Sequence, residues 1–134
     1  MKSFEDVRSH LAAHHPLRAS EPYFLSFDVE LEDGRRQGIY LAELETEGGR
    51  KVLRVSSPIA PFKKDDASRC LRFNWEQRLG YLAVGDLEGE PYLHLCENRP
   101  YSGLATSELD RIVGELGGLA DRLEHLLSKG QDTL

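Results

Sequence analysis

The sequence contains little cysteine and no segment typical of export. Its two cysteines, Cys70 and Cys96, are too few for a disulfide framework, and neither belongs to a CxxC pair. Both lie in apolar runs, so we expect small buried hydrophobic residues in a reducing compartment. The amino-terminal sequence MKSFEDVRSHLAAHH has early acids and no unbroken apolar run, which is unlike a signal peptide. These absences predict a cytoplasmic protein.

Long apolar runs and an excess of positive charge are also missing. No window approaches the roughly 20 apolar residues of a membrane-spanning helix, so we expect no membrane partner. Lys and Arg total 17 against 23 Asp and Glu, and this net charge of −6 argues against a nucleic-acid partner. With 40% hydrophobic and 30% charged residues, the chain suits a single domain over 1–134, with a flexible tail at about 129–134.

Sequence motifs for catalysis, cofactors and metals are absent as well. There is no P-loop, no GxGxxG, no HExxH and no serine in a GxSxG context. His10 and His14 have the i,i+4 spacing of zinc ligands, but Leu11 stands where HExxH has its glutamate. We interpret these histidines as partners of a helix C-terminus. We therefore predict no catalytic residue, no cofactor and no metal.

Alternating acids are the feature that keeps an enzyme open as an alternative. Asp28 and Glu30 alternate along one predicted strand, and Glu43 and Glu45 along the next. Paired carboxylates serve acid–base chemistry, whereas alternating acids on a solvent-facing strand need no function. We favour the second interpretation. A small enzyme with acids on the exposed sheet face stays an alternative, which a deep pocket with two converging carboxylates would favour.

The spacing of apolar residues predicts three helices and five strands. The predicted helices cover 3–15, 66–77 and a closing segment from Ser107. The predicted strands cover 23–31, 38–45, 51–57, 81–84 and 92–96. Short turns favour antiparallel neighbours, and Pro58 and Pro61 are expected to end the third strand. The order α-β-β-β-α-β-β-α predicts an α+β fold, an antiparallel five-stranded sheet with helices covering one face.

The closing helix has the strongest apolar periodicity in the chain. Its apolar face is expected to pack on the strand face that carries Leu25, Phe27 and Val29. The apolar face of the helix consists of Leu109, Ile112, Val113, Leu116, Leu119, Ala120, Leu123 and Leu127. The glycines at 114, 117 and 118 are placed on the opposite face, where each costs about 1 kcal/mol relative to alanine. They are either tolerated on an exposed surface or allow close approach by a partner chain, and they leave the continuity of the helix open.

The second predicted helix carries apolar residues on two sides. At 100° per residue, one broad face holds Ala67, Cys70, Leu71 and Trp75. Phe73 projects to the opposite side, and one sheet cannot cover both. We expect a partner subunit to cover one side, or Phe73 to pack under the 58–62 loop of its own chain. Asn74, near the helix end, is expected to hydrogen-bond free backbone groups.

Three segments carry a resemblance to a known family. They are RKVLRVSSPIAPF at 50–62, CLRFNWEQRLGYLAVGD at 70–86 and SELDRIVGELGGLADRLEHLL at 107–127. In this order they resemble the type III secretion chaperone (CesT-type) family and, more closely, its YbjN-like relatives, over about 23–127.

The resemblance implies a small, non-catalytic and usually dimeric protein without cofactors. Some relatives bind extended segments of other proteins, which implies a homodimer and a client protein as partners. The family's second helix lies at or near the dimer interface. The interface candidates are Phe73, Trp75, Leu71, Tyr81, Gly114, Gly117 and Gly118. A regulatory protein whose only activity is dimerisation is a further alternative.

Overall fold

Over residues 1–128, which the computed structural model describes, the chain forms three α-helices and six strands. The helices are α1 (Phe4–Ala12), α2 (Ala67–Glu76), which follows the 3-10 turn η1 (Lys64–Asp66), and α3 (Thr106–Ser128). The strands are β1 (Ala19–Glu21), β2 (Phe24–Glu30), β3 (Arg36–Glu45), β4 (Lys51–Pro61), β5 (Tyr81–Leu87) and β6 (Glu90–Pro100). The predicted tail at 129–134 lies outside the described residues.

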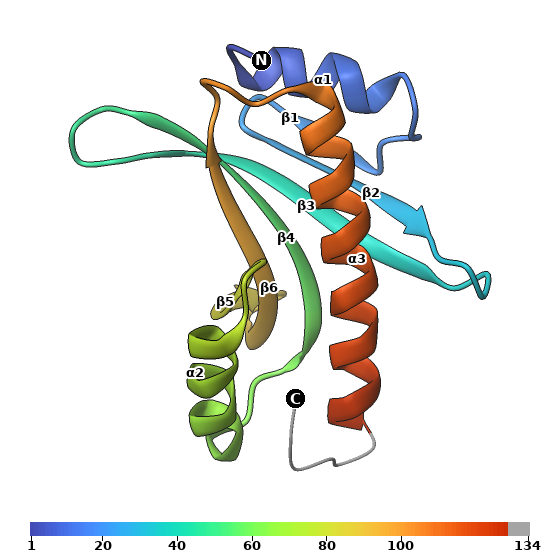
Figure 1. Cartoon of the computed structure of the whole chain (residues 1–134), viewed down its shortest axis with the longest axis vertical. Helices are drawn as coiled ribbons and strands as arrows, with labels where there is room; N and C mark the ends of the chain where they lie inside the picture. The colour runs from blue at the N-terminus through green and yellow to red at the C-terminus, as the bar shows by residue number, and fades with distance from the viewer. Residues whose placement is uncertain (129–134) are drawn as a thin grey trace.

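All strand pairs are antiparallel, and the strand order is β1-β2-β3-β4-β6-β5. Helix α3 runs along one side of the sheet, α1 lies at one end of the molecule, and α2 lies beside β5 (Figure 1). The predicted α+β class and antiparallel sheet are confirmed. The predicted count of five strands is wrong, because Ala19–Glu21 pairs with β2 as a sixth strand. Three residues are too short to show an alternating pattern, so only pairing reveals this strand.

The third predicted strand continues past the proline expected to end it. Strand β4 runs to Pro61, with a register shift against β6 between Pro58 and Ala60. The last pair between β3 and β4 is Tyr40–Ser56, so the missing N–H of Pro58 removes no bond from that ladder. The Pro58 carbonyl accepts a hydrogen bond from Gln37 Nε2 at 3.0 Å. The proline is tolerated because it lies beyond the last pair between β3 and β4, while pairing with β6 continues at Pro58–His94.

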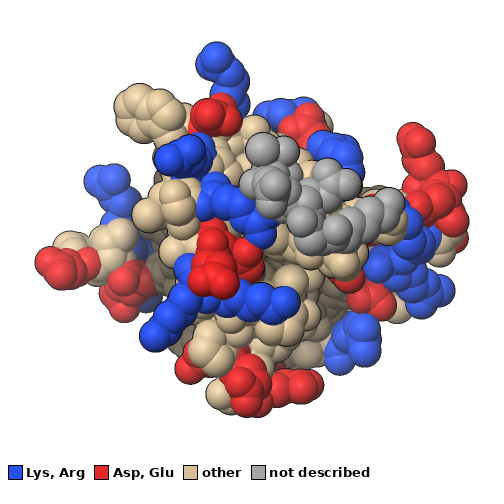
Figure 2. All heavy atoms as spheres, turned by 90° about the horizontal axis from the view of Figure 1, so that it is seen from below, with Lys and Arg blue, Asp and Glu red and all other residues tan. Residues whose placement is uncertain are grey.

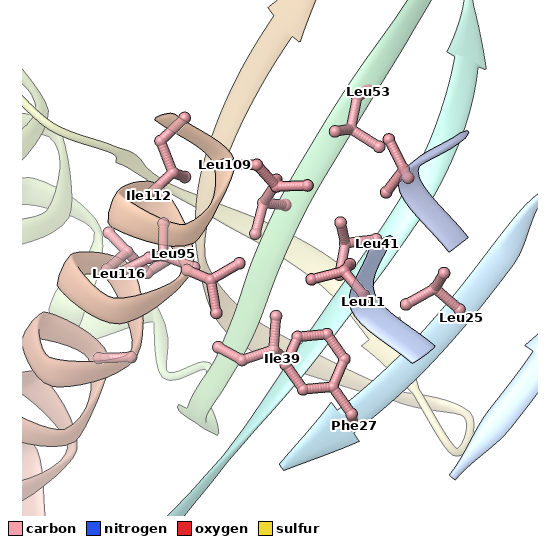
Figure 3. Packing of buried hydrophobic residues seen from close by; sticks show 14 of the residues in the cluster. Leu11, Leu25, Phe27, Ile39, Leu41, Leu53, Leu95, Leu109, Ile112 and Leu116 are labelled. Carbon is pink, nitrogen blue, oxygen red and sulfur yellow. The ribbon is translucent and has the colours of Figure 1, made fainter. Parts of the chain in front are cut away.

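The core lies between the sheet and the two helices α1 and α3. Helix α3 packs on β4, with β3 and β6 beside it, and its Leu109, Ile112 and Leu116 are fully buried (Figure 3). Leu25 and Phe27 lie instead toward α1, where the His15 ring stacks on Phe27 with centroids 4.3 Å apart. The predicted apolar face of α3 is therefore confirmed. Of the strand residues expected beneath it, Val29 does lie against α3, at Gly117, whereas Leu25 and Phe27 lie toward α1.

Helix α3 is continuous through its glycine pair, which the sequence left open. Gly117 is buried, and a Cβ built on it would lie 2.9 Å from Val29 Cγ2. Its predicted place opposite the leucines is wrong, because it faces the sheet and lets the helix backbone come close to β2. No helix in residues 1–128 combines the length and apolar character needed to cross a membrane.

Candidate functional site

The sheet face that points away from α3 carries a row of mostly small side chains. Ser26, Tyr40, Ser56, Cys96 and Tyr81 are successive register partners across β2, β3, β4, β6 and β5. Because side chains alternate along a strand, all five project to the same face, opposite the buried leucines. We call this surface the open face.

A cavity of about 420 Å³ lies on the open face. All of its lining residues within 1–128 belong to strands, and Phe24 of β2 and Leu87 of β5 are both among them. These strands are at or near opposite ends of the strand order, so the sheet must curve around the cavity. The remaining lining residues are Ser26, Tyr40, Ala42, Arg54, Ser56, Ala83, Val84, Gly85, Asp86, His94 and Cys96. The volume is within the range of about 300–1,000 Å³ that ligand pockets occupy.

Burial keeps Cys96 and His94, two titratable groups in the lining of this cavity, uncharged near neutral pH. It raises the pKa of the Cys96 thiol to about 11, so this cysteine is no ready nucleophile. Desolvation also lowers the pKa of His94. His94 Nε2 lies 3.1 Å from the Gly85 carbonyl oxygen, and because a carbonyl only accepts, this nitrogen carries the hydrogen. His94 points away from the buried Leu93 and Leu95, as predicted.

The acids considered for catalysis do not converge on the cavity. Asp28 lies 3.3 Å from an Arg18 nitrogen in an ion pair. Glu43 belongs to the opposite sheet face, where it accepts a hydrogen bond of 2.9 Å from the Tyr101 hydroxyl. Asp86 is the one acid in the described lining of the cavity. The alternative of acid-based catalysis therefore lacks the paired carboxylates that it requires.

The amino-terminal histidines join α1 to α3. His10 Nε2 lies 2.8 Å from Asp110 Oδ1, and the His14 ring meets the His10 ring edge-on with centroids 5.0 Å apart. Within residues 1–128, no group of three or more His, Cys, Asp or Glu side chains is arranged to hold a metal ion. The contact with Asp110 gives His10 a role in holding the two helices together, and His14 packs on His10.

The interface candidates on α2 divide between its two sides, although not as predicted. Cys70 is buried and Phe73 packs against the core, whereas Leu71 is 69% and Trp75 90% exposed. The predicted shared face of Cys70, Leu71 and Trp75 is therefore wrong. The helix docks on β5 through its i, i+3 and i+4 positions, Cys70, Phe73 and Asn74, which turns Leu71 and Trp75 to solvent.

Asn74 fixes α2 to the edge strand β5. Its Oδ1 accepts the Leu82 N–H at 2.6 Å, and its Nδ2 donates to the Leu82 carbonyl at 3.1 Å. The expected structural role is confirmed, but the backbone groups that it pairs belong to a strand and not to the helix end. These bonds occupy the outward backbone groups of β5 at Leu82.

The remaining interface candidates lie on β5 and α3. Tyr81 projects to the open face and donates a hydrogen bond of 3.0 Å to Asn98 Oδ1. Gly114 and Gly118 line a cavity of about 510 Å³ whose other wall includes residues 76–79, the last residue of α2 and the three that follow it. The structure thus brings two of the glycines near the end of α2 and separates Gly117 from them.

Sequence reasoning missed the cavity on the open face, although part of its signal was present. Ser26, Ala42, Ser56 and Cys96 are small residues at solvent-side positions of strands where larger polar residues are usual. The curvature that turns this face into a cavity depends on long-range pairing, which the sequence does not display. Arg54 was therefore not recognised as part of any site.

Charges of both signs are mixed over the end of the molecule seen in Figure 2. Lys and Arg atoms alternate with Asp and Glu atoms there, without a large area of one sign. This distribution differs from the continuous basic stripe that follows a phosphate backbone.

Comparison with known proteins shows the fold and not a family. No family model matches the sequence, and no curated protein matches it. A chain in the solved structure of the HopA1–SchA chaperone–effector complex has a similar fold, with a TM-score of 0.57 and 14% sequence identity. The match covers 90% of this chain and 89% of that chain. The protein has a type III secretion chaperone-like fold.

Proposed function

We propose that the protein is a non-catalytic, cytoplasmic, chaperone-like module that holds an extended segment of a partner protein. The cavity on the open face carries this proposal, because it is lined by strands, is largely apolar and has no described helix in its lining. A fold shared with a chain of a chaperone–effector complex supports it. The resemblance of the sequence to type III secretion chaperones points the same way.

Binding would combine side-chain burial with backbone pairing. An apolar side chain of the bound segment enters the cavity between Phe24 and Leu87, where desolvation supplies the affinity. The next outward backbone groups of β5 after Leu82 belong to Val84, whose side chain is 50% exposed. A segment that adds as a strand there would place alternate side chains on the open face.

The test is selection from a random 12-residue peptide-display library on the immobilised protein. Synthetic copies of the selected peptides are then titrated into purified protein by fluorescence anisotropy. Ala42→Phe puts a large side chain into the cavity and is expected to weaken binding at least tenfold, because Ala42 is one of its lining residues. Ala12→Phe, at an exposed position of α1, is the matched control and is expected to bind normally.

A selection that yields no enriched peptide would contradict the proposed function. Enriched peptides that bind Ala42→Phe as well as the unchanged protein would contradict the proposed site. A dimer that selects no peptide would favour the regulatory alternative.

We also propose that the chain forms a homodimer through the outer side of α2. Trp75 and Leu71 expose large apolar surfaces one helical turn apart, and a tryptophan that buries roughly 150–250 Å² is a typical interface anchor. Of the other interface candidates, Phe73 lies on the core side of α2 and Tyr81 on the neighbouring strand β5, and Gly114 and Gly118 face the end of α2 and the segment after it. Gly117 is buried inside its own chain and would not touch a partner subunit. It would affect the dimer only by allowing α3 to lie close to the sheet.

Light scattering tests this dimer. The unchanged protein is expected at twice the 15.1 kDa of one chain, and Trp75→Ser is expected at 15.1 kDa with an unaltered circular dichroism spectrum. Tyr23→Ser, which removes another aromatic side chain that is 67% exposed, is expected to leave the dimer intact. A Trp75→Ser protein with unchanged mass would contradict this interface.

A further inference from the structure

Arg54 differs from the other partly buried arginines in having no counter-charge among residues 1–128. The described arginines that are neither fully exposed nor fully buried are Arg8, Arg54, Arg69 and Arg99. Three of these form ion pairs within the chain, with Glu5, Asp66 and Glu97 respectively. Arg54 makes no hydrogen bond or ion pair with any described residue, and it lines the cavity of the open face.

The residues that flank Arg54 cannot neutralise it. Its register partners are Ala42 on β3, which offers no acceptor, and Asn98 on β6, whose Oδ1 already receives the Tyr81 hydroxyl. Asp86 also lines the cavity, yet it makes no ion pair with Arg54. The guanidinium is always protonated, and within the described part of the chain this charge has no ion-pair partner in a partly enclosed space.

An unpaired guanidinium in such a space favours an anionic partner. The neighbouring Cys96, Tyr81 and His94 are kept uncharged near neutral pH by burial, so they neither repel nor replace an anion. A carboxylate matches the planar fork of arginine with two parallel hydrogen bonds. Because the rest of the lining is largely apolar and the effective dielectric constant inside a cavity is lower than in water, this attraction is strengthened.

We propose that Arg54 gives the open face a preference for a single acidic residue in the bound segment. The Asp or Glu carboxylate would pair with Arg54 while a neighbouring apolar side chain fills the cavity beside Phe24 and Leu87. One acid is favoured over an acidic run, because the chain carries a net charge of −6 and repels strongly negative segments. This inference rests on the proposed function, since it specifies the chemistry of the segment that the same site holds.

The experiment compares two selections from the same random 12-residue peptide library, one on the unchanged protein and one on Arg54→Gln. Peptides from the first are expected to be enriched in a single Asp or Glu flanked by apolar residues, and peptides from the second are not. A synthetic peptide from the first selection is then compared with its Glu→Gln or Asp→Asn copy. A charge-assisted hydrogen-bond pair predicts a loss of roughly 10- to 100-fold in affinity for the amide copy on the unchanged protein. On Arg54→Gln the two peptides should bind about equally.

Arg72→Gln, which removes an equal charge from an exposed position of α2, is the matched control and should keep the preference. If peptides are selected without acidic enrichment, or if Arg54→Gln keeps the preference, this inference is wrong while the proposed function stands. If neither protein selects any peptide, the proposed function fails, and this inference fails with it.

Discussion

Alanine at Gly117 and at Gly118 should change stability in different directions, although the two glycines are neighbours in one helix. Replacing a helix-interior glycine with alanine gains about 1 kcal/mol from backbone propensity. At Gly118 the added Cβ meets nothing closer than Arg122 Nη1 at 4.0 Å, so this gain is realised in full. At Gly117 the Cβ would lie 2.9 Å from Val29 Cγ2 and 3.6 Å from Ile39 Cδ1. Overpacking of a core typically costs about 1–3 kcal/mol, so Gly117→Ala should lose between 0 and about 2 kcal/mol net.

Urea unfolding followed by circular dichroism measures both changes on one scale. Gly114→Ala, which adds a Cβ with nothing within 4 Å, serves as a second control and should also stabilise. In a Val29→Ala background the contact is removed, and Gly117→Ala should then stabilise like the other two. A Gly117→Ala protein as stable as Gly118→Ala in the unchanged background would refute the close approach of α3 to β2.

Further substitutions and a pH series test other parts of the structure. Asn74→Ala leaves both outward backbone groups of Leu82 without a protein partner and should cost about 1–3 kcal/mol in urea unfolding. Leu116→Ala, at a fully buried position, should cost about 2–5 kcal/mol, and a loss below about 0.5 kcal/mol would place this residue on the surface. Desolvation lowers the folded-state pKa of His15 and His94 below 6.5, so the unfolded chain binds protons first as the pH decreases. Thermal stability should therefore fall below about pH 6.5, and a protein with both histidines changed to Gln should lose most of this dependence.

Patterns confined to one element predicted most of the secondary structure. The helical spacing of Leu109, Ile112 and Leu116 identified the buried side of α3, and alternation identified the faces of β2 and β3. The errors arose where another element decides the outcome. Pro58 does not end β4, because the ladder from β3 has already stopped there. The prediction of which α2 residues face the sheet was wrong. The helix is oriented by the hydrogen bonds from Asn74 to Leu82, and the apolar periodicity of α2 does not reveal them.

The candidate site was predictable only in part for the same reason. Leu71 and Trp75 were named as interface candidates because large apolar residues on a short helix need an explanation; both are exposed, and their interface stays a prediction. The cavity beside Arg54 was not found, because it forms only when the five strands β2 to β6 curve around one face. Arg54 can be recognised as part of a site only once the pairing of distant strands has placed it beside the cavity.

Amide chemical-shift mapping with a library-selected peptide tests the central claim, that the open face holds an extended segment. The account predicts that the largest shifts occur at residues lining the cavity on β4, β5 and β6, among them Ser56, Ala83 and His94. It also predicts that these shifts weaken in Ala42→Phe and persist in Ala12→Phe. The largest shifts on the outer face of α3, around Gly114 and Gly118, with an unchanged open face, would contradict the account.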